Sequence, residues 1–240
     1  MTKAQAIPPI PVTCLAEFIT RGRRSAESVL RPFKFRDIDE GRARIIFRPP
    51  VLTVIRRYYK SGRHQAVIEE AINAWQEKAE DTEKKAVRSR LRSNVSGLKL
   101  FLRRYGDKEF EVLPVRKISC RIEQLTFTAP PDLWVRMNGR EKLIKLCFSK
   151  RKRAYAEIIL LVMRRAALQH GYRVHRRDAM YLNVLTGQEI VANFAFRQAI
   201  LTLSGAARDI TRMWPNVSRS TASASPFMKR TEPTMIIHRD

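Results

Sequence analysis

Asp132 and Lys145 are the residues of this chain whose types and spacing could do chemistry. They flank Asn138-Gly139, and an Asn-Gly pair between two strand-like runs is the strongest short-range signal for a two-residue type I′ hairpin. A turn at these two residues pairs Trp134 with Leu143 and Asp132 with Lys145, so that a carboxylate and an amine share one face of a sheet. That combination suits a metal-dependent phosphodiesterase centre, and it is also what a plain cross-strand ion pair looks like.

The elements that must position this pair follow from the hydrophobic periodicity. Apolar residues recur every three or four positions over 51–105 and 151–170, which predicts helices, and they alternate over 110–148, which predicts three consecutive antiparallel strands. A shift in the alternation near Gln124 predicts a β-bulge. Residues 180–185 add a further strand. The predicted fold class is therefore α+β or α/β.

Three regions are expected along the chain. Residues 1–110 read as a mainly helical N-terminal layer, and residues 111–212 as a mixed domain of three antiparallel strands, a helix and further strand or strands. Residues 213–240 are rich in Ser, Thr, Pro and Arg and show no periodicity. That composition predicts a flexible basic tail.

The charge of the chain points to its partner. Lys and Arg number 47 against 23 Asp and Glu, a formal net charge of +24. Such an excess repels itself and calls for a polyanion, of which nucleic acid, DNA ahead of RNA, is the first choice. A basic subunit inside a larger protein assembly is the alternative. The longest apolar run, 158–163, is too short to span a bilayer, so we expect no membrane partner.

The cysteines and the N-terminus indicate the compartment. Cys14, Cys120 and Cys147 are far apart and form no Cys-x-x-Cys motif, which indicates neither a disulfide framework nor a zinc site. Residues 1–20 contain three prolines and lack the continuous apolar stretch of a signal peptide. We therefore expect a cytoplasmic protein.

Two basic clusters are the candidate phosphate contacts. The run Lys150, Arg151, Lys152 and Arg153 precedes or opens a predicted helix, where cations are unfavourable, so we expect it to meet an external anion such as phosphate. Arg103 and Arg104 are the other candidates. They belong to a basic face of the helical segment that is either solvated or laid on phosphate, and its remaining members are Arg88, Arg90, Arg92 and Lys99.

The order helix, three strands, helix, strand resembles the core of the PD-(D/E)XK nuclease superfamily over residues 113–187. Pro131-Asp132 matches the Pro-Asp element of that family, and Lys145 matches the lysine of its (D/E)-x-K triplet. The resemblance implies that Asp132 binds Mg²⁺ and that Lys145 orients or activates the attacking water. The triplet's acidic position is occupied by Leu143, which cannot ligate a metal.

Two hypotheses account for Leu143. In the first, the second acid has moved to Glu157 on the following helix, so that Asp132 and Glu157 hold Mg²⁺ and act in catalysis with Lys145. In the second, the site is inactive and the fold serves binding or scaffolding. Glu157 is also well placed for an ordinary ion pair, four residues along a helix, with Arg153.

Function is thus predicted at two levels. The first hypothesis is a nucleic-acid-associated protein with a nuclease-like core, either a Mg²⁺-dependent DNA nuclease or a degenerate relative. The second is a non-catalytic DNA- or RNA-binding or scaffolding subunit, so enzymatic activity stays open. The sequence contains no P-loop, dinucleotide-binding, zinc-protease or nucleophile-elbow motif, which disfavours those four enzyme classes.

Overall fold

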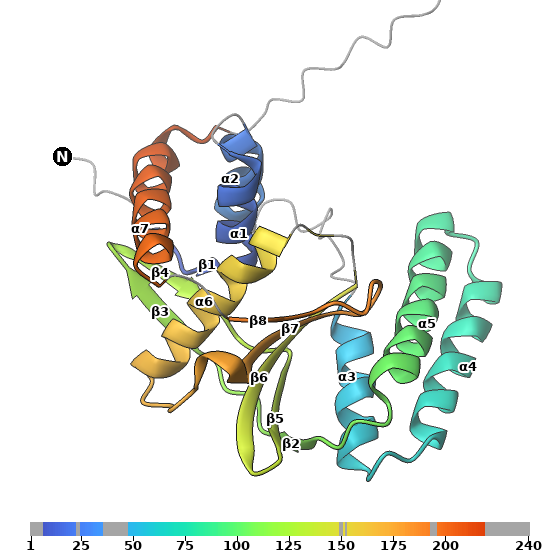
Figure 1. The fold of residues 1–240 in the computed structure, drawn as a ribbon. Helices are drawn as coiled ribbons and strands as arrows, with labels where there is room; N and C mark the ends of the chain where they lie inside the picture. Colours follow the sequence, from blue (N-terminus) through green and yellow to red (C-terminus); the bar gives the residue numbers. More distant parts are fainter. Residues whose placement is uncertain are drawn as a thin grey trace, which may run out of the picture.

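Seven helices and two β-sheets make up the part of the chain that the computed structural model describes, residues 7–22, 25–35, 48–148, 151, 153–192 and 196–218 (Figure 1). The helices are α1 (Val12–Arg21), α2 (Ala26–Lys34), α3 (Arg48–Lys60), α4 (Ala66–Asp81), α5 (Lys85–Tyr105), α6 (Arg153–Gln169) and α7 (Phe196–Met213). The strands are β1 (Ile10–Pro11), β2 (Glu111–Leu113), β3 (Ser119–Ile122), β4 (Leu125–Thr128), β5 (Leu133–Met137), β6 (Arg140–Cys147), β7 (Ala179–Asn183) and β8 (Glu189–Val191). Across these ranges no helix has the length and apolar character needed to cross a bilayer. The mixed α+β class predicted from the sequence is confirmed.

The larger sheet has the strand order β2-β5-β6-β7-β8. The first three strands form an antiparallel meander, and α6 carries the chain from β6 to β7, which runs parallel to β6. Two of the three expected meander strands are therefore correct. The third strand of the meander is β2. The segment 118–127, which was expected to be that strand, forms β3 and β4 and belongs to the other sheet.

Strands β3 and β4 belong to a smaller sheet of order β1-β4-β3. The expected bulge near Gln124 is instead a tight turn, because Ile122 pairs with Leu125 and Glu123 has a positive φ of 53°. Directly opposed residues point to the same face of a sheet. A two-residue turn thus produces the same phase shift in the apolar pattern that predicted a bulge.

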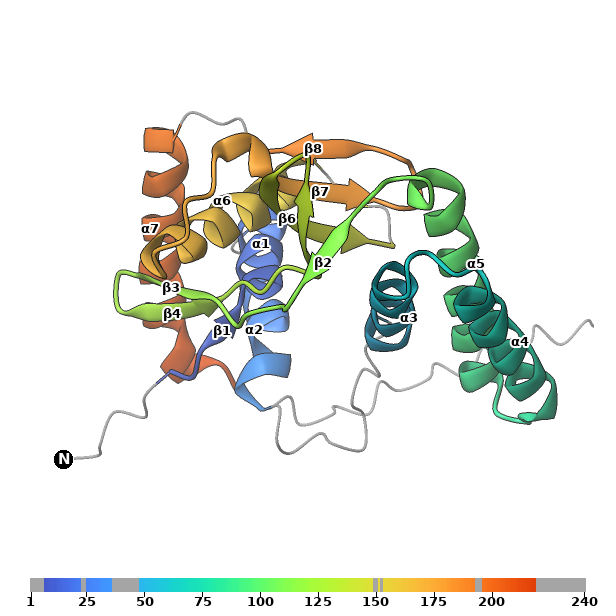
Figure 2. The ribbon, with the colours of Figure 1, turned by 90° about the horizontal axis from the view of Figure 1, so that it is seen from below.

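The larger sheet is covered on both faces, and Figure 2 shows the two layers on either side of it. On one side α6, with α1, α2 and α7, packs over Trp134, Leu143 and Cys147. On the other side α3, α4 and α5 pack over Leu133 and Ile144, among others. Alternate residues of β6 thus enter different cores, which makes the whole second half of this strand buried.

The division of the chain at residue 110 does not match these two cores. The N-terminal region is helical as expected, but α1 and α2 pack with α6 on one side of the sheet, while α3 to α5 pack on the other. The helices before β2 therefore do not form one layer of their own. Each set completes one face of the sheet that carries the candidate site.

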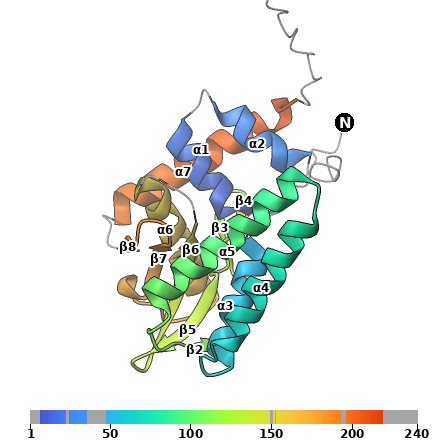
Figure 3. The ribbon, with the colours of Figure 1, turned by 90° about the vertical axis from the view of Figure 1, so that its right-hand side faces the viewer.

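Helices α4 and α5 form an antiparallel hairpin beside α3, as Figure 3 shows. Arg88 of α5 joins the two helices: its Nε donates to the carbonyl of Ala79 at 3.1 Å and its Nη2 to the carbonyl of Thr82 at 2.7 Å. These carbonyls belong to the negative end of α4, where a cation is favourable. The hairpin is thereby closed next to its connecting residues 82–84.

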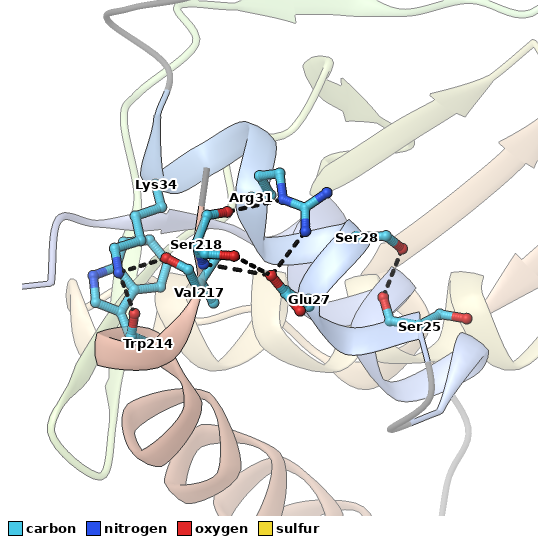
Figure 4. Close-up of polar contacts among 8 residues, drawn as sticks. All are labelled: Ser25, Glu27, Ser28, Arg31, Lys34, Trp214, Val217 and Ser218. Atoms are coloured by element: carbon cyan, nitrogen blue, oxygen red, sulfur yellow. Dashed lines mark hydrogen bonds and ion pairs between the residues drawn. The ribbon is translucent and has the colours of Figure 1, made fainter. Parts of the chain in front are cut away.

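Residues 214–218, the last that the structure describes, are held by contacts with α2. The flexible tail expected from residue 213 therefore does not begin there. Lys34 Nζ donates to the carbonyl oxygens of Trp214 and Val217 at 2.6 and 2.9 Å (Figure 4). It also donates to the Pro215 carbonyl oxygen at 3.0 Å. Ser218 adds hydrogen bonds to Glu27, and the Trp214 and Val217 side chains are buried. Residues 214–218 are therefore part of the packed structure, and the remainder of the expected tail, 219–240, lies outside the described residues.

Candidate functional site

The predicted hairpin is present, and from Leu133–Ile144 to the turn it has the predicted register. Asn138 and Gly139 both have positive φ, 52° and 71°, as a type I′ turn requires. Strands β5 and β6 pair Met137 with Arg140 and Trp134 with Leu143, among others, which is the alignment derived from the turn. One residue before β5, the Asp132 amide donates to the Ile144 carbonyl at 2.8 Å, so the regular pairing ends at Leu133 and Ile144 and the predicted backbone pairing of Asp132 with Lys145 is not formed. The side chains of Asp132 and Lys145 nevertheless meet.

Asp132 and Lys145 form an ion pair, which we call the buried pair because each residue is only 7% exposed. Lys145 Nζ lies 2.8 Å from Asp132 Oδ1 and 3.2 Å from the Pro130 carbonyl oxygen. Asp132 Oδ2 accepts a hydrogen bond of 2.9 Å from the Leu146 amide. Both carboxylate oxygens therefore have partners within the protein, and the two buried charges compensate each other.

Helix α3 fixes the backbone at this point. The Arg56 guanidinium donates through Nε and Nη2 to the Asp132 carbonyl oxygen at 3.1 and 2.6 Å. A bidentate contact of this kind restrains both the position and the orientation of the carbonyl. The segment that enters β5 is thus held from the α3 side, while the Asp132 side chain is held by β6.

Leu143 lies in the core and not in a polar site. It is fully buried in the cluster under α6, with Trp134 and Cys147. Because residues two apart in a strand share a face, Leu143 and Cys147 flank Lys145 on the same side of β6. The position at which the family resemblance implies an acid is thus an apolar packing position here.

Glu157 makes the ion pair that its helical spacing allowed. Its Oε1 lies 2.8 Å from Arg153 Nε in the first turn of α6, with the two side chains 31% and 69% exposed. Within the described residues, no hydrogen bond or ion pair joins Glu157 to Asp132 or Lys145. The role of Glu157 as a relocated metal ligand therefore stays a hypothesis that this geometry does not support.

The residues around the buried pair do not fit a divalent cation. Mg²⁺ takes six oxygen ligands in near-octahedral geometry, and a protein usually supplies one or two carboxylates with free lone pairs. Here the one carboxylate is shared between an ammonium group and an amide, and Leu143, two residues before Lys145 on β6, has no oxygen to offer a metal. Within the described residues no group of three or more His, Cys, Asp and Glu side chains is placed to hold a metal ion.

The basic residues predicted to meet phosphate fall into three groups. Arg151 instead pairs with Glu17 of α1 at 3.0 Å and lies over the Tyr155 ring, so its charge is balanced from within the protein. Arg153 is occupied by Glu157. Lys150 and Lys152 lie outside the described residues.

The two arginines at the end of α5 differ in environment. Arg104 donates to the Leu185 carbonyl at 3.1 Å and packs against Gly187, so it supports the turn between β7 and β8. Arg103 is exposed, and in the described part of the chain no carboxylate lies within ion-pair distance of it. Arg103 alone of this pair is thus available to an external anion.

An open groove of about 890 Å³ runs along α5, and we call it the basic groove. Its walls come from α5, from the residue after β6 and from the turn after β7. The lining residues are Lys85, Arg88, Ser89, Arg92, Ser93, Ser96, Gly97, Leu100, Phe148 and Leu185. Helix α5 carries seven basic residues and no acidic one, which makes this groove a cationic surface.

Part of the basic groove was visible in the sequence. Arg88 and Arg92 belong to the basic face considered there, but Lys85 and the three serines were missed. The signal is the spacing, since Lys85, Arg92 and Arg103 are separated by 7 and 11 residues and so lie on one side of a helix with 3.6 residues per turn. Phe148 and Leu185 carried no such signal, because only the folded sheet brings them to α5.

Comparison with known proteins gives no match, either to a protein-family model or to a curated protein. The site must therefore be interpreted from its own residues and geometry.

Proposed function

We propose that this protein binds nucleic acid through the basic groove, and that the buried pair of its nuclease-like hairpin is structural. The observation that carries the proposal is the groove itself, in which Lys85, Arg88 and Arg92 line one side of a helix that has no acidic residue. Within the described residues no carboxylate lies within ion-pair distance of these three side chains. Cations without an internal carboxylate partner are those that a phosphate backbone can neutralise.

Three features support a nuclease-like ancestry for the core. The meander β2-β5-β6 is followed by α6 and by the parallel strand β7, the order that the resemblance implies. Asp132 directly precedes the second strand of this meander, and Lys145 lies on the third. These features support a relative of the nuclease superfamily. Leu143 and the closed contacts of Asp132 favour the degenerate form over an active enzyme.

The length of the cationic surface suits a nucleic-acid strand. From Lys85 to Arg103 the helix advances by about 27 Å, given a rise of 1.5 Å per residue. Arg88 is already held by the carbonyls of α4, so its guanidinium loses little freedom when it binds a ligand. Cys14 and Cys120 are free, buried thiols, which supports a reducing compartment such as the cytoplasm.

Binding is tested by fluorescence anisotropy with a labelled oligonucleotide over a series of salt concentrations. Lys85→Ala/Arg92→Ala should weaken binding and reduce the slope of log affinity against log salt by about 0.7 to 0.9 for each lost phosphate contact. Arg208→Ala is the matched control, because Arg208 is an exposed arginine of α7, on the other side of the sheet. Equal effects of the groove and control variants would place the binding surface elsewhere.

Nuclease activity is tested on the same preparation. Wild-type protein incubated with DNA and either Mg²⁺ or Mn²⁺ is expected to leave the substrate intact, since the metal-ligand set is incomplete. Cleavage that disappears in Asp132→Asn would contradict the structural role of the buried pair and favour the catalytic hypothesis.

A further inference from the structure

The basic groove has two chemically different halves. Lys85, Arg88 and Arg92 line the half that begins at the start of α5, with Ser89 between the two arginines. The other half is apolar and contains Leu100, Phe148 and Leu185. A phosphate backbone matches the charge of the first half. Binding of phosphate alone does not account for the apolar side chains of the second half.

We propose that the basic groove takes a single strand of nucleic acid, with phosphates on the cationic half and an unpaired base against Phe148. This inference rests on the proposed function and narrows it to one form of ligand. In a duplex the faces of the bases are stacked on each other inside the helix. In a single strand each base has a free π-face, and stacking on an aromatic ring adds to the phosphate contacts at any sequence.

The position of Phe148 is set by a glycine of α5. A methyl group at Gly97 would lie 3.1 Å from Phe148 Cδ1, which is closer than ordinary van der Waals contact. The absence of a side chain at residue 97 thus lets the ring lie against the helix. Phe148 is half-buried and packs partly on the core below α5, so the remainder of its surface is available at the groove.

The opposite apolar wall is held firmly by hydrogen bonds. Asn183 Oδ1 accepts from the amides of Leu185 and Thr186 at 3.1 and 3.2 Å. Arg104 donates to the Leu185 carbonyl, and Gly187 donates to the Asn183 carbonyl at 2.7 Å. The Leu185 side chain, 38% exposed, is therefore presented on a fixed turn. A wall that is ordered before binding loses less entropy when a ligand arrives.

The cationic half has the spacing of a strand. Successive groove cations on α5 are three and four residues apart, which corresponds to steps of about 4.5 and 6 Å along the helix. Neighbouring phosphates of an extended strand can therefore meet successive cations. Ser89 lies between Arg88 and Arg92 and offers a hydroxyl donor there, whereas the Ser93 hydroxyl already donates to the Ser89 carbonyl at 2.8 Å.

The experiment measures binding of strands and duplexes by fluorescence anisotropy. Labelled oligonucleotides of about 12 nucleotides are prepared as single-stranded DNA, single-stranded RNA, the corresponding duplexes and an abasic DNA strand of equal charge. Each is titrated with wild-type protein and with Phe148→Leu, which keeps an apolar side chain but removes the aromatic face. The urea midpoint of Phe148→Leu checks that the variant is folded, and Leu185→Ser is a second variant that alters the apolar half without touching Phe148.

Wild-type protein should bind a single strand at least tenfold more tightly than its duplex. The comparison of single-stranded DNA with single-stranded RNA shows which sugar the groove prefers. Phe148→Leu should lower single-strand affinity by roughly 5- to 100-fold and leave duplex and abasic-strand affinity almost unchanged. Equal binding of strands and duplexes, with no effect of Phe148→Leu or Leu185→Ser, would overturn this inference but leave the proposed function standing. Absence of binding to every oligonucleotide at low salt would overturn the proposed function itself.

Discussion

Replacing Lys145 with methionine tests whether the buried pair is structural. Methionine has a similar length and is apolar, so it fills the space of the lysine chain but leaves the Asp132 carboxylate without its counter-charge. The carboxylate would keep one partner, the Leu146 amide at 2.9 Å, in surroundings where the residue is 7% exposed. Asp132→Asn and the double variant Asp132→Asn/Lys145→Met complete a double-mutant cycle.

The expected loss of stability follows from the burial of this pair. Removing one partner of a buried ion pair typically costs about 3 to 5 kcal/mol, because the other charge is left uncompensated. For a chain of this size, about 1 kcal/mol lowers the melting temperature by roughly 2 to 4 °C, so Lys145→Met should melt roughly 6 to 20 °C below the wild type. The double variant removes both charges, and Asn can still accept from the Leu146 amide. It should therefore be more stable than Lys145→Met.

Circular dichroism during thermal and urea unfolding provides the measurement. The matched control is Arg153→Met, which breaks the pair with Glu157 at the same distance, 2.8 Å, but with side chains 69% and 31% exposed. An exposed pair contributes less than about 1 kcal/mol, so this control should unfold almost like the wild type. A Lys145→Met protein within about 1 kcal/mol of the wild type, or a double variant less stable than both single variants, would refute the reasoning.

Three further predictions concern other parts of the fold. Burial raises the pKa of the Cys120 thiol to about 11, so as the pH rises the unfolded chain loses this proton first, at the ordinary thiol pKa of about 8.5. Between pH values of about 8.5 and 11 the free energy of unfolding should therefore fall by up to about 1.4 kcal/mol per pH unit relative to Cys120→Ala. Parallel pH profiles of the two proteins in urea titrations would contradict this. Gly187→Ala should lower the free energy of unfolding by roughly 1 to 3 kcal/mol, and by more than Gly139→Ala. Both glycines have positive φ, but only at Gly187 would the added methyl group meet a neighbour, Arg104. Thermal melts of the two variants compare them directly. Lys34→Met should lower the free energy of unfolding by about 1 to 3 kcal/mol and speed tryptic cleavage near the described C-terminal end, because three carbonyls lose their shared donor; an unchanged cleavage rate would count against this contact.

The hairpin could be predicted because its signals are local. Asn138-Gly139 selects the turn type, and the turn type alone fixes the register of residues within about ten positions of it. Strand β2 could not be predicted, since it has three residues and its partner lies beyond the intervening β3–β4 hairpin. The phase shift near Gln124 was visible, but a bulge and a two-residue turn alter the alternation in the same way.

Only those contacts of the candidate site that join residues close in the sequence could be predicted. The pairing of Asp132 with Lys145 follows from the hairpin, whereas the contact of Arg151 with Glu17 depends on how α1 docks beside α6. The basic groove likewise combines α5 with Phe148 and Leu185, which are 48 to 100 residues away from the lining residues of that helix. Contacts of that range are decided by packing, which periodicity does not encode.

The contact of Lys34 with residues 214–217 has a consequence for synthesis of the protein on the ribosome. Its hydrogen bonds join positions 180 to 183 residues apart, so this contact cannot form until almost the whole described chain has left the exit tunnel. The α3–α5 bundle needs only neighbouring segments and can form early, whereas the apolar side of α1 has to wait for α6. Through most of translation, the apolar side of α1 in the nascent chain therefore lacks the α6 surface on which it packs in the folded protein. That interval is when chaperones, or aggregation with other nascent chains, act on it.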